Sequence, residues 1–437
     1  MKKTLLTLFI FICLCSPFVQ AQMNDKALQD FLNDTTVRTG IAGISIYEPA
    51  TNTYLYNHNE DKYFTPASNM KLFSLYAGLK YLGDSLIGLR YKKEKNITTI
   101  YPTGDPTFLH PEFKNQNVYN FLKKQEAIQY TTQQFCKYLG DGWTWNDYID
   151  DYMAPRSEFP INGNTIYIAK TRKGVKITPK FIKLKQQQLV NQFTNNKDYP
   201  FYKSFDSNDL YFNSDKKTIP EKITPIPLSI KYNEIPFYLE DTLHKKISYA
   251  KSNNVGNTNV DGLTVIHSQP ADTLYKIMMS RSDNFFAEQT LLMASNELLG
   301  YMSNDKMIDT LLKTEFKNLP TKPRWVDGSG LSRYNLFSPK DFVFLLEKMK
   351  NEFGMERMTK ILPTGNSGTL TNYYVKEHGF IYAKTGTISG VVALSGYLYT
   401  KTNKLLAFSI IINNFTNAPR SARRAIEKFL IEVRNSN

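Results

Sequence analysis

The sequence predicts an α+β fold in which both ends of the chain build one antiparallel sheet around a large inserted region. Strand-like alternation occurs early, within 41–56, and returns in three consecutive runs within 380–412. Helical periodicity instead marks 71–82 and 271–299. With 437 residues, of which 41% are hydrophobic, the chain is long enough for two or more domains with packed cores.

Residues 1–21 predict a secretory signal peptide rather than part of the fold. Lys2 and Lys3 precede an apolar run, and Ala21 ends a small-residue cleavage site. The run is short for a membrane span, and no later segment is long and apolar enough for one. Removal of the peptide leaves one cysteine, Cys136, so no intrachain disulfide is expected. We therefore expect an exported protein of the bacterial periplasm or cell envelope.

The formal net charge of +14 favours an anionic setting such as a cell-wall polymer or lipid headgroups. The alternative, that the basic surplus only aids solubility, agrees equally well with the sequence. Binding to nucleic acid would rest on charge alone and disagrees with export, so no nucleic-acid partner is expected.

The first part of the catalytic domain is expected at 22–89. Residues 41–47 and 53–56 predict a pair of strands joined by a turn. Apolar residues then line a broad helical face over 71–82, which indicates a buried helix that Gly83 ends.

Residues 90–257 differ in character and predict one or two inserted subdomains. They contain a stretch rich in Trp, Tyr and Asp at 143–148. A Lys-rich, apolar-poor run follows over 170–217, and we expect it to be exposed.

Residues 258–437 are expected to complete the catalytic domain. Two helices are predicted within 271–299, with a break at 280–284, and a third over 341–349. Three strands follow at 380–383, 391–398 and 405–412, and a terminal helix packs one apolar face on the sheet. That face is formed by Ala422, Ile426, Phe429, Leu430 and Val433.

Ser68 and Lys71 lie at the opening of the first predicted helix. Unpaired backbone N–H groups and the positive dipole end favour developing negative charge there. A serine hydroxyl is a poor nucleophile without a base, and a lysine one turn on can reach it if its pKa is depressed. The same spacing begins at Ser214 and Ser248, so this motif alone favours the alternative of an N-cap serine and a solvated lysine.

Ser282-Asp283-Asn284 falls in the break between two predicted helices. A hydroxyl there can relay a proton to a leaving nitrogen, and the Asn284 amide can both hold Lys71 and accept a substrate N–H. The alternative is an ordinary helix N-cap, because all three residue types favour that position.

Lys384-Thr385-Gly386-Thr387 ends a strand-like run. An ammonium and two hydroxyls on an edge strand can hold a terminal carboxylate, and Gly386 lets a substrate backbone approach closely. The Thr387 and Ser68 backbone N–H groups can form an oxyanion hole. The alternative is a plain strand-to-turn transition. The three motifs nevertheless follow the order of the acyl-serine mechanism of penicillin-interacting enzymes, which argues against coincidence.

At these motifs the chain resembles the serine D-Ala-D-Ala carboxypeptidases of the class C low-molecular-mass penicillin-binding proteins, the type-4 group. The wide gap between Ser68 and Ser282 indicates the large insertion typical of that family. Further matches lie at 104–107, 327–335, 362–363 and 368–370.

The resemblance implies a penicillin-recognising serine transpeptidase/β-lactamase-like domain, with a five-stranded antiparallel sheet flanked by helices. It implies hydrolysis of the terminal D-Ala-D-Ala bond of peptidoglycan peptide stems, or of the cross-link between stems, and covalent inhibition by β-lactam antibiotics. No cofactor and no metal are expected. The likeness is strong over 40–110 and 260–437 and weak over 165–255.

Residue roles also follow from the resemblance. Asp147 resembles a family aspartate that contacts the free amine of the stem's diamino acid, although it is equally compatible with a surface cap. By position, the resemblance implies that Ser68 is the nucleophile and Lys71 the general base. Ser282 is the proton relay, and Asn284 positions the substrate and the lysine. Lys384 and Thr387 bind the substrate carboxylate, and Thr385 and Gly386 complete their motif.

Two alternatives keep the same fold. A serine β-lactamase or esterase would need fast deacylation, but no Glu-x-x-Leu-Asn follows the second motif. A non-catalytic peptidoglycan-binding protein is the other, and the three intact motifs argue against it. A metal hydrolase is poorly supported because the five histidines show no ligand spacing, and no Gly-x-Ser-x-Gly segment supports a Ser-His-Asp hydrolase.

Overall fold

The computed structural model describes residues 26–135, 137–172, 174–187, 201–213, 225–250 and 262–437. The expected signal peptide and Cys136 lie outside the described residues.

The central sheet has five strands in the order β14-β15-β16-β1-β2, and every neighbouring pair is antiparallel. It confirms the predicted sheet built from both ends of the chain. The strands are β1 (Ile41–Glu48), β2 (Thr53–His58), β14 (Ile381–Ile388), β15 (Val391–Tyr399) and β16 (Leu405–Asn413).

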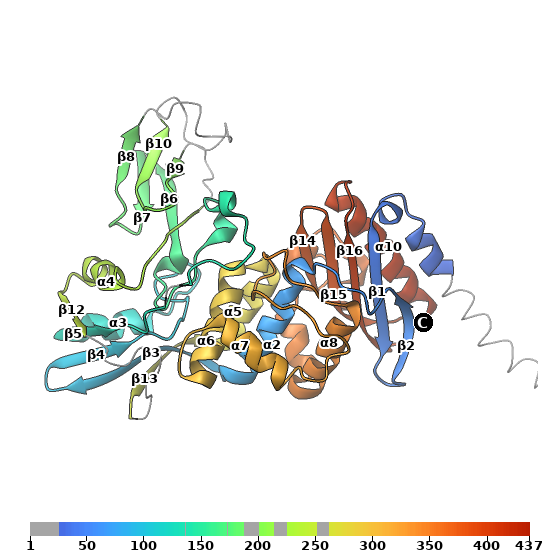
Figure 1. Ribbon diagram of the computed structural model, residues 1–437, viewed down its shortest axis with the longest axis horizontal. Coiled ribbons are helices and arrows are strands. Elements are labelled where there is room, and N and C mark those ends of the chain that lie inside the picture. Colours follow the sequence, from blue (N-terminus) through green and yellow to red (C-terminus); the bar gives the residue numbers. More distant parts are fainter. Residues whose placement is uncertain (1–25, 136, 173, 188–200, 214–224, 251–261) are drawn as a thin grey trace, which may run out of the picture.

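Helices cover both faces of this sheet (Figure 1). On one face, sheet residues such as Ala393 and Ile411 join the core formed with the helices of the middle of the molecule. These helices are α2 (Lys71–Tyr81), α5 (Ala271–Ile277), α6 (Asn284–Leu299), α7 (Asn304–Lys313), α8 (Pro339–Phe353) and α9 (Met355–Ile361).

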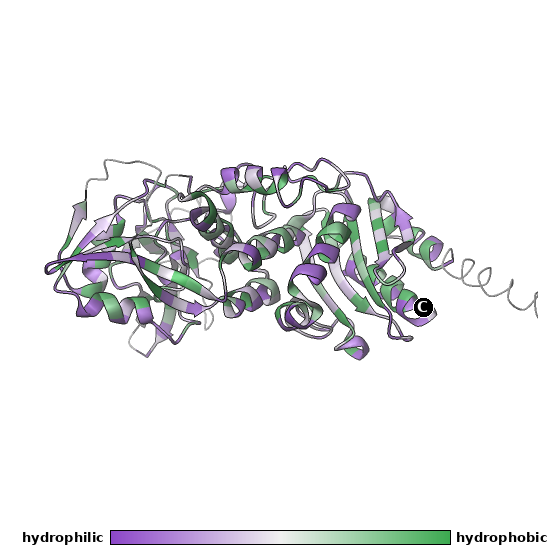
Figure 2. Cartoon of the chain, turned by 90° about the horizontal axis from the view of Figure 1, so that it is seen from below, coloured by the Kyte–Doolittle hydropathy of each residue, from purple (hydrophilic) through white to green (hydrophobic). Residues whose placement is uncertain are grey.

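The other face is covered by α10 (Pro419–Ser436). In register across three strands, Ile44, Ile410 and Leu394 point to this side, because alternate residues of a strand share a face. The predicted apolar face of the terminal helix packs on them, and all five of its residues are buried. Figure 2 shows hydrophobic residues along the strands of this sheet.

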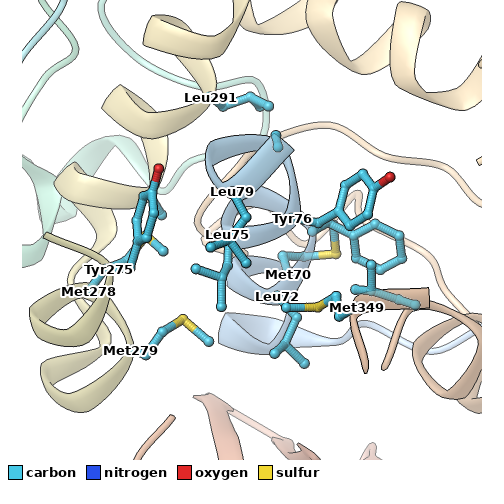
Figure 3. Close-up of a cluster of buried hydrophobic side chains, with 14 of the residues drawn as sticks. Met70, Leu72, Leu75, Tyr76, Leu79, Tyr275, Met278, Met279, Leu291 and Met349 are labelled. Atoms are coloured by element: carbon cyan, nitrogen blue, oxygen red, sulfur yellow. The ribbon is translucent and has the colours of Figure 1, made fainter. Parts of the chain in front are cut away.

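Helix α2 is buried on all sides, from Lys71 to Leu79. Its side chains Leu72, Leu75 and Leu79 pack among methionines and tyrosines from neighbouring helices (Figure 3). Gly78 permits this fit, because a Cβ there would lie 2.7 Å from the Thr290 side chain. The helix that carries the first motif is thus fixed by the core rather than by solvent-facing contacts.

The inserted region has its own sheet, in the order β12-β5-β4-β3-β13. Strand β3 starts at Ser85 directly after α2, and β13 ends at Pro270 directly before α5. The expected boundary at 89/90 therefore falls within β3, and the one at 257/258 lies outside the described residues. The strands are β3 (Ser85–Glu94), β4 (Ile97–Tyr101), β5 (Ala127–Thr131), β12 (Ile247–Ala250) and β13 (Thr264–Pro270), with helices α3 (Asn117–Lys124) and α4 (Ile235–Leu243).

Two small sheets complete the inserted region, in the orders β11-β6-β7 and β8-β10-β9. Their residues Ile166 and Leu210 share one core with Ile100 and Tyr130 of the larger sheet. The prediction that the Lys-rich run is exposed fails at Lys203, which is 1% exposed. The strands are β6 (Thr165–Thr171), β7 (Gly174–Thr178), β8 (Leu184–Gln187), β9 (Phe201–Lys203), β10 (Leu210–Asn213) and β11 (Ile226–Pro227).

Candidate active site

Ser68 of the first motif lies in a short 3-10 helix, η2 (Ala67–Met70), and Lys71 is the first residue of α2, which follows directly. Two glycines from distant segments of the chain, a loop and strand β14, pack against this turn. A Cβ on Gly330 would lie 1.9 Å from the Ala67 carbonyl oxygen, and one on Gly386 would lie 2.7 Å from the Pro66 carbonyl oxygen. The absent side chain of Gly386 therefore admits the nucleophile turn itself, where the sequence suggested the approach of a substrate backbone.

The turn is also tied to the sheet below it. The Asn69 side-chain amide donates to Ser395 Oγ at 2.7 Å, and Ser395 Oγ donates to Ser409 Oγ at 2.8 Å. All three residues are fully buried. Ala67 has a φ of 47°, an uncommon value for a residue with a side chain, and this contact set holds it there.

Lys71 is fully buried, and its amine contacts three oxygens. Nζ lies 2.9 Å from Ser68 Oγ, 2.6 Å from Asn284 Oδ1 and 2.6 Å from the Ser329 carbonyl oxygen. The Asn284 amide nitrogen donates to the Tyr152 carbonyl at 3.1 Å, which fixes the oxygen of that amide on the lysine.

These contacts decide what a neutral Lys71 can do. The amide oxygen and the carbonyl oxygen can only accept, so they take the two protons of the amine. The remaining lone pair then faces the Ser68 hydroxyl, which is the arrangement of a general base and its nucleophile. Burial lowers the pKa of Lys71 to about 8, although the carboxylates of Asp327, Asp283 and Glu288 act against that shift.

A buried ion pair supports this lysine, and the sequence analysis missed it. Arg156 donates two hydrogen bonds to Glu288 Oε2, at 2.9 and 2.7 Å, and both side chains are almost completely buried. The other carboxylate oxygen of Glu288 accepts the Ser329 N–H at 2.7 Å. Glu288 thereby fixes the peptide whose carbonyl holds Lys71. Arg156 and hydrogen bonding with Ser329 outweigh burial and keep the pKa of Glu288 below its usual range.

Asp327 stabilises the same loop, whose Ser329 carbonyl contacts Lys71. Its carboxylate accepts from the Gly330 N–H at 2.9 Å, the Ser332 N–H at 2.7 Å and Trp143 Nε1 at 2.8 Å. Burial, and then the charge of Glu288, raise the pKa of Asp327. An aspartate before Gly-Ser-Gly indicates such a turn in the sequence. The sequence does not, however, indicate that Trp143 is a hydrogen-bond partner of this aspartate.

The second motif meets the third across the site. Ser282 ends a π-helical turn, η6 (Met278–Ser282), at a φ of 64°, and Asp283 caps α6 by accepting the Phe286 N–H at 2.8 Å. Lys384 Nζ donates to Ser282 Oγ at 2.8 Å and to the Thr385 carbonyl at 2.7 Å. Burial, followed by the charge of Lys71, places the pKa of Lys384 well below its usual range.

Strand β14 runs through the third motif to Ile388, so it is longer than the strand predicted at 380–383, and the motif lies in its last half. β14 is an edge strand, and the Ala383 N–H bonds outside the sheet, to the Pro363 carbonyl at 3.0 Å. Because N–H groups of alternate strand residues point the same way, those of Thr385 and Thr387 also face the open edge. An oxyanion hole needs this orientation of the Thr387 N–H.

Asp147 ends the short helix η3 (Trp145–Asp147) and is half-buried. It does not contact the three motifs directly. It neighbours Tyr152, whose pKa is raised by burial and then by the carboxylates of Asp150 and Asp147. The Tyr152 carbonyl in turn accepts a hydrogen bond from Asn284. Tyr152 therefore links Asp147 indirectly to the second motif.

A cavity of about 400 Å³ opens beside Ser282 and Asn284. Its wall brings together the catalytic and inserted regions, since Tyr152 and Tyr167 line it opposite α6. The remaining lining mixes polar residues such as Arg281 with apolar ones such as Phe286, so the cavity suits a chain that carries both kinds of group, such as a peptide. Within the described parts of the chain, no group of His, Cys, Asp and Glu residues could hold a metal ion.

The profile of the D-Ala-D-Ala carboxypeptidase 3 (S13) family matches residues 24–433. The chain belongs to this family. It is a serine-type D-Ala-D-Ala carboxypeptidase, and the family resemblance inferred from the motifs is confirmed. In the ranges that the structure describes, no helix has the length and apolar character of a membrane span.

Individual relatives agree with this assignment. Penicillin-sensitive carboxypeptidase A from Dictyostelium discoideum is 26% identical, over 84% of this chain and 82% of its own length. A D-alanyl-D-alanine carboxypeptidase from an Actinomadura species is 23% identical, over 92% of this chain and 83% of its own. The crystal structure of penicillin binding protein 4 from Haemophilus influenzae shares the fold, with a TM-score of 0.70 at 21% identity, and the match covers 93% of this chain and 98% of that one.

Proposed function

We propose that this S13 peptidase cleaves the D-Ala-D-Ala bond of peptidoglycan peptide stems through an acyl-enzyme on Ser68. The observation that carries the proposal is the environment of Lys71. Its two amine protons meet obligate acceptors, and its lone pair faces the Ser68 hydroxyl at 2.9 Å. No other base is bonded to Ser68 within the described residues.

In the acylation step, Ser68 Oγ attacks the carbonyl carbon of the penultimate D-Ala, and its proton passes to Lys71. The carbonyl π electrons move onto oxygen, which the N–H groups of Ser68 and Thr387 stabilise. The C–N bond then breaks, the leaving nitrogen takes a proton from Ser282, the proton held by Lys71 replaces the one that Ser282 gave, and D-Ala departs. Water attacks the resulting ester, returns a proton to Ser68 Oγ and releases the shortened peptide.

Ser282 is proposed to protonate the leaving nitrogen. Its oxygen accepts from Lys384, so its own proton is free to point at another acceptor. Asn284 holds Lys71 in place and offers its side chain at the cavity wall. This division of roles agrees with the position of both residues beside the cavity.

Lys384, Thr385 and Thr387 are proposed to bind the substrate carboxylate at the open edge of β14. Gly386 serves this site indirectly, because it lets β14 lie against the nucleophile turn. Asp147 is proposed to contact the free amine of the stem's diamino acid, and its place beside Tyr152 at the cavity wall supports this role.

We place the enzyme in the bacterial periplasm or cell envelope, cleaving stem termini and also cross-links between stems. The basic, apolar and small-residue pattern of 1–21 supports export. The name of the penicillin-sensitive relative supports covalent inhibition by β-lactams. The inserted region between Ser85 and Pro270 is proposed as a second domain that builds the far wall of the cavity.

A serine β-lactamase or esterase is the less favoured reading. Such activity needs a base that activates water against the acyl-enzyme. Glu288 lies near Lys71, but its oxygens are occupied by Arg156, Ser329 and Asn304. This supports a long-lived penicillin adduct rather than rapid turnover.

The test is release of free D-Ala from a pentapeptide stem, measured by mass spectrometry beside a Ser68→Ala control. We expect stoichiometric D-Ala and tetrapeptide from the wild type and none from the control. A cross-linked stem dimer in the same assay reports endopeptidase action. A folded wild type that cleaves neither substrate would support the non-catalytic binding role instead.

A further inference from the structure

A third cation reaches the edge of β14 from the far side of the sheet. Arg423 of α10 donates through Nη2 to Thr387 Oγ1 at 2.7 Å. It also lines a small cavity of about 20 Å³ together with Thr385 and Ile426. The guanidinium therefore lies under the two threonines of the third motif, on the side of the strand opposite to Gly386 and the nucleophile turn.

The hydrogen bonds of Thr387 show what its hydroxyl can offer. Its proton points to the Gly386 carbonyl at 2.7 Å, and its oxygen accepts from Arg423. A hydroxyl whose proton is engaged in this way has only a lone pair left, and a carboxylate cannot bind to a lone pair. The Thr387 hydroxyl as it stands is thus a poor ligand for an anion.

Arg423 has the donors that Thr387 lacks. A guanidinium carries five N–H groups in a planar fork, and within the described residues this one gives a single hydrogen bond, to the Thr387 side chain. Its buried Nε–H has no acceptor among the described residues. Donors in excess of acceptors, on a fixed positive charge, are the chemistry that binds carboxylates.

The charges of the site point the same way. Within the described parts of the chain, neither Lys384 nor Arg423 lies within ion-pair distance of a carboxylate. The charge of Arg423 also contributes to the low pKa of Lys384, after burial and Lys71, so the two cations are within electrostatic reach of one another. An anion placed at the strand edge would be attracted by both.

We propose that Arg423 is a specificity-determining residue that recognises the C-terminal carboxylate of the substrate, with Thr387 as its positioning partner. This inference rests on the proposed function and deepens it. The carboxylate binds at the open edge of β14 between the guanidinium and the ammonium of Lys384. The Thr387 hydroxyl orients the guanidinium, and it can turn its proton from the Gly386 carbonyl to the carboxylate once substrate arrives.

The test compares two peptides that differ in the proposed ligand alone. One ends in D-Ala-D-Ala with a free carboxylate, and the other carries a terminal amide. For Arg423→Gln, kcat/KM for the acid should fall about 10- to 100-fold, as expected for a lost hydrogen bond to a charged group, with most of the loss in KM. For the same variant, kcat/KM for the peptide amide should change less than about twofold, because the amide makes no ionic contact with Arg423. Arg423→Lys should recover part of the loss.

Arg424→Gln is the matched control. Arg424 is the next residue of α10, but it is exposed, pairs with Glu427 and donates to the Asn372 carbonyl. It should leave both substrates unchanged. A second measurement uses benzylpenicillin and its methyl ester, for which Arg423→Gln should slow acylation by the acid alone.

The outcomes separate three explanations. Equal losses for acid and amide would show that Arg423 only holds the strand or the helix, and they would overturn the proposal. Unchanged kinetics for both substrates would also overturn it. A wild type that cleaves neither peptide would instead refute the proposed function, which the Arg423 variants do not affect.

Discussion

Acylation of Ser68 should become faster with rising pH, because Lys71 acts as a base only when it is neutral. Burial lowers the pKa of Lys71 from 10.5 to about 8. With that value, roughly 9% of the protein holds a neutral lysine at pH 7, and roughly 90% does at pH 9. The rate constant for acylation should therefore rise about tenfold between these pH values and level off above them. An unperturbed lysine would give a rise that continues beyond pH 10.

The assay is the second-order rate constant for acylation by a fluorescent penicillin, followed by stopped flow from pH 6 to 9.5. Lys71→Arg is the matched control, since a guanidinium stays protonated throughout this range and cannot accept the serine proton. We expect no acylation of that variant at any pH. A flat profile in the wild type, or normal acylation of a folded Lys71→Arg protein, would refute the assignment of Lys71 as the base.

Two further predictions concern the groups that hold this lysine and its serine. Gly386→Ala should slow acylation about 100-fold, because its Cβ meets the Pro66 carbonyl oxygen at 2.7 Å and displaces the nucleophile. Gly354→Ala, which has a φ of 76° but meets open space, should lose stability and keep full activity; equal activity of both variants would contradict the first expectation. Arg156→Met should lower the free energy of unfolding by about 3–5 kcal/mol, because it leaves Glu288 buried without its partner. Lys360→Met, which breaks an exposed pair with Glu356, should cost less than about 1 kcal/mol in the same urea titration, and similar losses for the two variants would argue against a structural role of the buried pair.

The sequence predicted those parts of the fold that depend on local pattern. The five strands of the central sheet, helix α2 and the apolar face of α10 were predicted from periodicities of two and 3.6 residues, which are local properties of the sequence. The order of the three motifs was enough to suggest the family. It could not show that Gly386 makes room for the nucleophile turn, because that contact joins distant segments.

The parts that escaped prediction are those set by tertiary packing. Arg156 and Glu288 are 132 positions apart, and neither sits in a pattern that marks burial. Arg423 looks like any polar residue of an amphipathic helix until the helix is placed under β14. Lys203 lies in a Lys-rich run whose composition predicts exposure. It can be buried because the Ser204 and Ser207 carbonyl oxygens accept hydrogen bonds from its amine, both at 3.0 Å. In each case a charged side chain is satisfied by partners that only the fold brings near.

The central claim is that Ser68 forms a covalent acyl-enzyme. The most direct measurement is intact-protein mass spectrometry after incubation with benzylpenicillin, beside a folded Ser68→Ala control. The account predicts one added penicilloyl group in the wild type, located on the peptide that contains Ser68, and no addition in the control. Penicilloylation that persists in Ser68→Ala, or an unmodified wild type that still binds peptidoglycan, would contradict it.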